Sequence, residues 1–117
     1  MAIKLFDSEL KVMEIIWREG EATAKDIAHE LNGTIGWSKT TTYAIINKCL
    51  KKGAISRGDR FLCRPLIPKR DVQEHETTEL IDKLYGGSKS SLVAALLKVE
   101  DLDAKQIEGL RELAKTL

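Results

Sequence analysis

The sequence predicts a mainly α-helical chain with a small β-hairpin, in which a winged helix-turn-helix domain of residues 1–70 precedes a helical domain of residues 71–117. Three observations predict this. Apolar residues recur at helical spacing in three segments before residue 53. A short basic hairpin pattern follows these segments. Beyond two prolines, helical spacing returns in segments that have little apolar bulk.

The first two helices are expected from their end signals. Asp7 or Ser8 is placed to cap a helix that runs to about Arg18. Thr23 opens the second helix, which is expected to stop at Asn32–Gly33. Each carries an apolar stripe at the spacing of a buried face.

The third expected helix is capped by Ser38, runs to about Lys52 and stops at Gly53. Helical periodicity gives it an apolar face of Thr42, Ile45, Ile46, Cys49 and Leu50. Its other face carries Lys39, Thr40, Tyr43, Ala44, Asn47, Lys48 and Lys51. Solvated helix faces usually include glutamates, whereas this helix contains no acidic residue. Short hydrogen-bonding side chains beside lysines suit base edges and phosphates, so this face is expected to enter a DNA groove.

A basic hairpin is expected after the third helix. Ile55–Arg57 and Phe61–Arg64 are β-prone runs joined by the turn dipeptide Gly58–Asp59. Arg57 and Arg60 fall near the tip. Three helices followed by such a hairpin predict the winged variant of the helix-turn-helix.

Charge is distributed unevenly along the chain. Residues 37–70 hold nine basic side chains and one acidic, and residues 1–70 have a net charge of +5 against −4 for residues 71–117. The basic part is expected to meet a polyanion and the acidic part a protein. The alternative is the dipolar surface of an enzyme.

Helical spacing resumes beyond Pro65 and Pro68, which mark a linker, and runs from about Asp71 to Gly86–Gly87. The apolar run 92–97 and a last helix with an Asp-x-x-Gln capping signal follow. Because these segments cannot close a core alone, a homodimer is expected. The residues expected between chains are Leu80, Leu84, Leu92, Leu96, Ile107, Leu110 and Leu113. The alternative is that these helices fold back on the first domain.

Catalytic and metal sites are not indicated. His29 and His75 are isolated, and no glycine-rich phosphate loop occurs, so neither an enzyme nor a cofactor is expected. Cys49 and Cys63 lack metal-ligand spacing and are expected to be reduced, buried thiols of a cytoplasmic protein.

Met1–Phe6 is too short for a signal peptide, and no apolar run approaches the ~18 residues of a membrane span.

Four blocks of sequence occur in an order and spacing typical of one family. They are Glu9–Trp17, Trp37–Thr41 with Lys51–Ile55, Leu84–Gly87 with Ser91–Val93, and Ile107–Leu113. With these blocks the chain resembles, over nearly its full length, the penicillinase-repressor family of bacterial transcription regulators. That family includes the methicillin-resistance repressors and the copper-responsive repressors.

The resemblance implies a homodimeric repressor that binds a two-fold-symmetric, double-stranded operator, here of resistance or stress genes. It also implies that the third helix enters the major groove. The residues expected to contact DNA are Ser38, Lys39, Thr40, Thr41, Tyr43, Asn47, Lys48, Lys51, Arg57 and Arg60. The alternative is a winged helix that binds protein instead of DNA. Such a face would expose several large apolar side chains, and this one has only Tyr43.

Two departures from the family pattern concern how repression ends. In the β-lactam-responsive members, cleavage falls between an asparagine and a phenylalanine, where this chain has Ala95 and Leu96. Copper-responsive members end in a cysteine cluster, and no cysteine follows Cys63 here. We therefore expect release by a signalling protease or a small-molecule effector that acts on the dimerisation domain, without a copper site.

Overall fold

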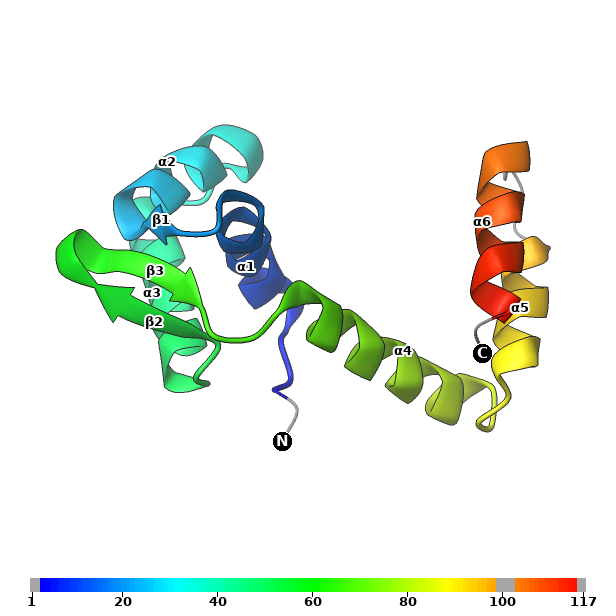
Figure 1. The fold of residues 1–117 in the computed structure, drawn as a ribbon. Helices are drawn as coiled ribbons and strands as arrows, with labels where there is room; N and C mark the ends of the chain where they lie inside the picture. The colour runs from blue at the N-terminus through cyan, green and yellow to red at the C-terminus, as the bar shows by residue number, and fades with distance from the viewer. Residues whose placement is uncertain (1–2, 99–102, 116–117) are drawn as a thin grey trace. The chain divides into compact units, whose positions relative to one another are not determined.

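The computed structural model describes residues 3–98 and 103–115 (Figure 1). Its contacts divide the chain after Gln73 into two units. The first unit contains α1 (Asp7–Glu19), β1 (Ala22–Thr23), α2 (Ala24–Ile35), α3 (Lys39–Lys51), β2 (Ile55–Gly58), a 3-10 turn η1 (Asp59–Phe61) and β3 (Leu62–Pro65). Helix α4 (Lys69–Leu84) starts in this unit and continues into the second, which also contains α5 (Lys89–Leu97) and α6 (Ala104–Lys115). The expected fold class, mainly α with a small β-hairpin, is confirmed.

The hairpin belongs to a three-stranded antiparallel sheet with the strand order β1-β3-β2. Ala22 of β1 pairs with Cys63 of β3, and Gly58 of β2 pairs with Leu62 of β3. Strand β1 was not expected from the sequence, because two residues are too few to show an alternating pattern. Through this strand, the connection between α1 and α2 is hydrogen-bonded to the hairpin (Figure 1).

The core of the first unit lies among α1, α2, α3 and the sheet. Met13, Ile16, Ile27 and Ile46 are wholly buried there. Each such side chain contributes about 1.5–3 kcal/mol through removal from water. The apolar face expected on the third helix is confirmed: Thr42, Ile45, Ile46 and Cys49 are buried, and Leu50 packs against the core. The opposite face of α3 is consequently turned outward.

Two of the expected caps are present. The Ser38 hydroxyl accepts the backbone N–H of Thr41 at 3.1 Å, and the Thr23 hydroxyl accepts that of Asp26 at 3.1 Å. A side-chain cap of this kind satisfies a backbone donor that the helix itself leaves unpaired. These two bonds define where α3 and α2 begin.

The cap of α1 differs from the expectation. Phe6 is the N-cap residue, in place of Asp7 or Ser8. Its backbone N–H donates to Oε1 of Glu9 at 2.7 Å. The Glu9 carboxylate, three residues into the helix, therefore caps this terminus. A search for short capping side chains such as Asp7 or Ser8 does not reveal this role of Glu9.

Helix α2 continues beyond the expected stop at Asn32–Gly33 and ends at Ile35. The left-handed residue is Gly36, with φ of +74°, and its N–H donates to the Asn32 carbonyl at 3.1 Å. The Asn32 side chain then donates to the Trp37 carbonyl at 3.1 Å. Because these bonds close the helix one turn later, the turn into α3 is only three residues long.

The tip of the hairpin is also not the expected Gly58–Asp59 turn. Gly58 is extended, with φ of −109°, and remains on β2. The left-handed residues are Arg60 and Phe61, with φ of +58° and +54°. The three-residue turn η1 therefore connects the strands, and neither left-handed position is a glycine.

Pro65 and Pro68 do not form an open linker, because Pro65 ends β3 and Pro68 directly precedes α4. Val72 of α4 is buried in the core of the first unit. The Trp17 indole N–H donates to the Ile67 carbonyl at 2.9 Å. These contacts explain why the first unit extends to Gln73, inside the helix.

The second unit shows the expected helix ends. Gly86 and Gly87, after α4, have φ of +56° and +83°. Ser88 caps α5, accepting the Ser91 N–H at 3.2 Å. Before α6, the Asp103 N–H donates to Gln106, and the Gln106 N–H donates to Asp103, at 3.0 and 2.7 Å.

Candidate nucleic-acid interface

The outward face of α3 carries polar and basic side chains. Lys39, Thr40, Thr41, Asn47, Lys48 and Lys51 are exposed. Tyr43 is half-buried, because one side of its ring packs toward the core. The Ser38 hydroxyl is occupied at the helix start, where it also donates to the Thr41 hydroxyl oxygen at 3.0 Å. Hydrogen-bonding groups therefore occupy the centre of this face and ammonium groups its ends.

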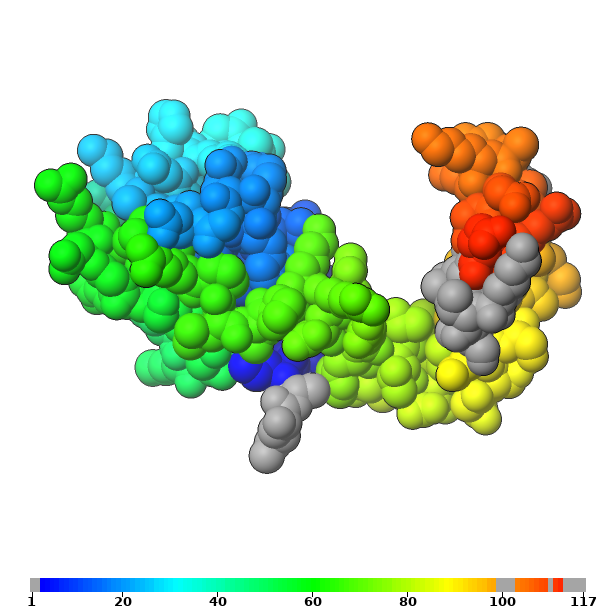
Figure 2. Space-filling model, in the orientation of Figure 1, coloured from blue at the N-terminus to red at the C-terminus, as the bar shows by residue number. Residues whose placement is uncertain are grey.

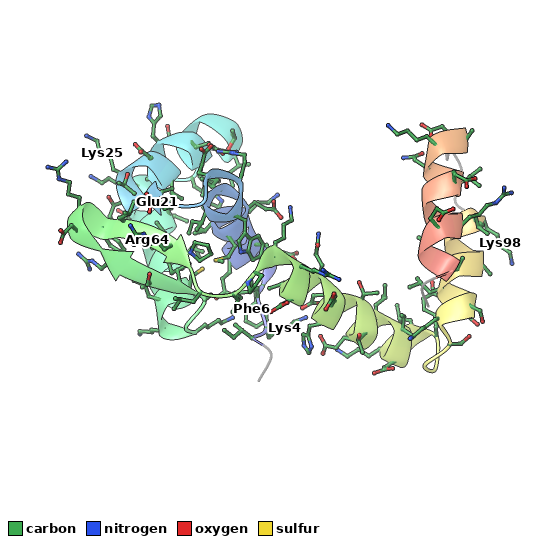
Figure 3. The ribbon with its side chains drawn as sticks, viewed as in Figure 1. Lys4, Phe6, Glu21, Lys25, Arg64 and Lys98 are labelled. Carbon is green, nitrogen blue, oxygen red and sulfur yellow. The ribbon has the colours of Figure 1, made fainter. Side chains whose placement is uncertain are left out.

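Eight of the nine basic residues in this region fall into two groups. Three of them are held by glutamates of the same unit: Lys52 by Glu9 at 2.6 Å, Arg64 by Glu21 at 2.6 Å and Lys69 by Glu14 at 3.0 Å. Figure 3 shows the second of these pairs beside the hairpin. Five others form no ion pair with any described residue: Lys39, Lys48, Lys51, Arg57 and Arg60. The net positive charge is thus concentrated on α3 and the hairpin tip.

Aromatic contacts join α3 to the hairpin. The rings of Tyr43 and Phe61 meet edge to face, with centroids 5.7 Å apart and planes at 88°. The Lys39 ammonium lies 5.6 Å from the Tyr43 ring centroid, and the Arg57 guanidinium lies 3.9 Å from that of Phe61. Each ring therefore contacts one cation as well as the other ring. Helix and hairpin therefore form one continuous surface, from which the hairpin tip projects (Figure 2).

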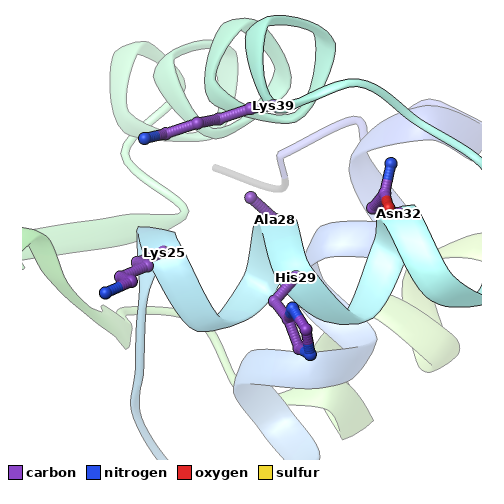
Figure 4. Close-up of a pocket in the computed structure, with 5 residues that line it drawn as sticks. All are labelled: Lys25, Ala28, His29, Asn32 and Lys39. Carbon is purple, nitrogen blue, oxygen red and sulfur yellow. The ribbon is translucent and has the colours of Figure 1, made fainter.

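A shallow hollow separates α2 from α3. It is lined by Lys25, Ala28, His29 and Asn32 of α2 and by Lys39 of α3 (Figure 4). The Lys25 and Lys39 chains extend toward the same side of the hollow. Lys25 was not among the residues expected to contact DNA. Its place in the first turn of a helix, where backbone N–H groups favour anions, is the signal that would have found it.

The other titratable candidates lie apart from this surface. Cys49 and Cys63 are buried and not bonded to each other, as expected of small core residues. Burial raises the pKa of the Cys49 thiol to about 12 and also raises the pKa of Cys63. His75 lies in the second unit, 3.7 Å from Glu79. Among the described residues, no group of three His, Cys, Asp or Glu side chains is placed to hold a metal ion, and no helix is long and apolar enough to cross a membrane.

The residues expected between chains are partly described. Leu80 and Leu84 of α4 are 40% and 70% exposed. Leu92 and Leu96 of α5 and Ile107 of α6 are half-buried, as is Ala95. The side chains of Leu110 and Leu113 lie outside the described residues.

Two comparisons of sequence place this chain among known proteins. A family profile described as "Penicillinase repressor" matches residues 5–116. The methicillin resistance regulatory protein MecI of Staphylococcus aureus (strain N315) is 32% identical over 113 residues, which cover 94% of this chain and 92% of the relative. The penicillinase repressor of Bacillus licheniformis is 27% identical over 94% of this chain and 88% of its own length.

The fold is similar to that of a solved relative. The solution structure of the DNA-binding domain of the repressor BlaI matches with a TM-score of 0.56 and 28% identity, covering 61% of this chain and 90% of that domain. The Bacillus licheniformis BlaI monomer in complex with the blaP half-operator matches with a TM-score of 0.50 and 30% identity, covering 58% of this chain and 87% of that chain. With its winged-helix fold and a profile match over almost its whole length, the chain belongs to the penicillinase repressor family.

Proposed function

We propose that this chain is a DNA-binding transcriptional repressor that places α3 in the major groove of an operator. One observation carries the proposal. The outward face of α3 has no acidic residue, and five basic side chains on that face and on the adjoining hairpin tip form no ion pair with any described residue. The relative BlaI has been solved in complex with a half-operator, which supports the same use of the fold.

The proposed groove contacts follow from side-chain chemistry. The Asn47 amide offers a donor and an acceptor that match the major-groove edge of adenine. The Thr40 and Thr41 hydroxyls reach base edges or phosphates at the start of α3. Lys39 and Lys48 would bind guanine or phosphate oxygens. Ser38, Tyr43 and Lys51 complete the proposed contact set on α3.

The hairpin and α2 are proposed to hold the phosphate backbone. Arg57 and Arg60 are exposed at the hairpin tip, without acidic partners among the described residues. Lys25, at the start of α2, faces the hollow beside Lys39. Contacts of this kind position a protein on the duplex and carry little sequence information.

Dimerisation is proposed through residues 71–117, with residues 1–70 as the DNA-binding domain. The exposure of Leu80 and Leu84 supports it, because a second chain would remove both from water. The two DNA-binding domains of such a dimer would recognise a two-fold-symmetric operator of resistance or stress genes. We assign no catalytic role to the chain and place it in the cytoplasm.

Release of repression is proposed to act on the dimerisation domain. A signalling protease could cut near Ala95–Leu96, or a small effector could loosen the packing of α5. Either event would separate the two DNA-binding domains of the dimer. Affinity gained from simultaneous binding, roughly 10²–10⁴-fold, would then be lost. A chain that ends at Gly86 tests this: folded residues 1–70 with collapsed operator affinity would support the proposal, and unchanged affinity would refute it.

Operator selection from random duplex DNA by the full-length chain tests the function itself. The expected product is a two-fold-symmetric sequence whose half-sites lie about 10 base pairs, or a multiple, apart. Failure to enrich any sequence would instead favour a winged helix that binds protein. That second candidate has less support, because Tyr43, the large apolar residue on this face, already packs against Phe61.

A further inference from the structure

Phe61 lies where the hairpin contacts α3, and none of the proposed DNA contacts involves its side chain. We propose that Phe61 is a positioning residue for operator recognition. Its ring fixes the Arg57 guanidinium and ties the hairpin to Tyr43, so that α3 and the hairpin meet a duplex as one rigid surface. This inference rests on the proposed function.

The geometry around the ring supports this role. The Arg57 guanidinium carbon lies 3.9 Å from the Phe61 ring centroid, which is close cation–π stacking. The same ring meets Tyr43 edge to face at 5.7 Å. Arg57 forms no ion pair with any described residue, and its guanidinium stacks on this ring. A guanidinium held by a ring retains its N–H donors for a phosphate.

The backbone supports the role independently. Arg60 and Phe61 both have left-handed φ values, +58° and +54°. Bulky side chains rarely adopt this region, and such conformations persist only where the surrounding contacts fix them. At Phe61 those contacts are the ring's packing against Tyr43 and the core. This packing therefore fixes the position of the ring on which Arg57 stacks.

The expected consequence is that Phe61 acts on DNA through Arg57. Without the ring, the guanidinium would move freely and lose entropy on binding a phosphate. Replacing Phe61 should thus resemble replacing Arg57, and replacing both should add little. Replacing a residue that only supports the fold would lower stability instead. Its effect on DNA affinity would then be the same whether or not Arg57 is present.

A double-mutant cycle in the full-length chain tests this dependence. The variants are Phe61→Leu, Arg57→Gln and the double variant, and the probe is a duplex selected from random DNA by the unmodified chain. We expect each single variant to weaken binding roughly five- to tenfold, and the double variant to be within about twofold of Arg57→Gln. Independent losses that multiply in the double variant would overturn the proposal.

Two further variants separate positioning from stability. Phe61→Tyr retains the ring and should bind within about twofold of the unmodified chain. Leu62→Ala removes apolar bulk from the adjacent, half-buried position and should lower the melting temperature without reducing the slope of log affinity against log salt. An equal loss of affinity in Leu62→Ala would mean that hairpin stability alone explains the effect of Phe61.

A measurement without DNA distinguishes this inference from the proposed function. In the free protein, the side-chain hydrogens of Arg57 should show ring-current-shifted NMR signals that disappear in Phe61→Leu. If no duplex binds, the proposed function fails, yet these signals still decide whether Phe61 holds Arg57. Unshifted Arg57 signals in the unmodified chain would overturn the inference even if operator binding is confirmed.

Discussion

The ammonium of Lys52 lies 2.6 Å from Oε1 of Glu9, and this ion pair joins the end of α3 to the start of α1. Glu9 is 1% exposed and also accepts the Phe6 N–H. Lys52 further donates to the Lys4 carbonyl at 2.7 Å and lies over the Phe6 ring (Figure 3 labels Lys4 and Phe6). These contacts tie the end of α3 to the start of α1 and to the segment that precedes it.

Removal of Lys52 should therefore destabilise the fold. Lys52→Met leaves the Glu9 carboxylate buried without a cation, and we expect the free energy of unfolding to fall by about 3 kcal/mol. The adjacent Lys51 is exposed and makes no described ion pair. Lys51→Met should alter stability by less than about 0.5 kcal/mol while weakening DNA binding. Urea unfolding of the two variants measures the difference, and equal stabilities would show that the ion pair has no structural role.

Arg57→Gln and Arg60→Gln should weaken binding to all duplexes to a similar extent. A lost phosphate contact lowers the slope of log affinity against log salt by about one unit. The control is Lys98→Gln, which removes the same charge from an exposed position in the second unit. Fluorescence anisotropy at several salt concentrations gives the slopes. A loss confined to one sequence would indicate that the hairpin reads bases.

Leu84→Lys should dissociate the proposed homodimer. Leu84 is 70% exposed, and a lysine there would require burial of an unpaired charge between two chains. Leu66→Lys is the matched control, because Leu66 is 58% exposed but lies in the first unit. Sedimentation at tens of micromolar should show a monomer for the first variant and a dimer for the second. A monomer for the unmodified chain would contradict dimerisation.

Alkaline pH should destabilise the protein through Cys49. Burial raises its pKa from the ordinary value of 9.0 to about 12. Because the unfolded chain releases this proton first, the stabilising contribution is complete below pH 9 and is lost as pH rises toward 12. We expect a fall of about 1–2 kcal/mol between pH 8 and 10.5. Urea unfolding should show a shallower fall in Cys49→Ala, and identical slopes would contradict a buried thiol.

Much of the fold follows from local sequence signals. The caps at Ser38 and Thr23 and the apolar face of α3 arise from residues within one turn of each other, and all are confirmed. The end of α2 was placed wrongly because Gly33 and Gly36 are both possible stops. Only the hydrogen bond from Gly36 to Asn32 and the contact of Asn32 with Trp37 distinguish them.

The parts that were missed depend on contacts between distant residues. Lys52 and Glu9 are 43 positions apart, as are Arg64 and Glu21. Counting charges along the chain could not show that these cations are already paired. The left-handed Phe61 has no local signal either, because the contact with Tyr43 that accompanies it comes from another element. Periodicity along the sequence thus does not show which distant side chains contact each other.

The most direct test of groove recognition by α3 is the base-by-base specificity of Asn47→Ala on the selected operator. Asn47 is exposed on the outward face of α3, so its removal should leave the fold intact. We expect affinity for the operator to fall by about 1–3 kcal/mol, and discrimination to relax at one base pair per half-site. Affinity for unrelated duplexes should remain unchanged. An unaltered specificity profile, or an equal loss on all sequences, would contradict the placement of α3 in the major groove.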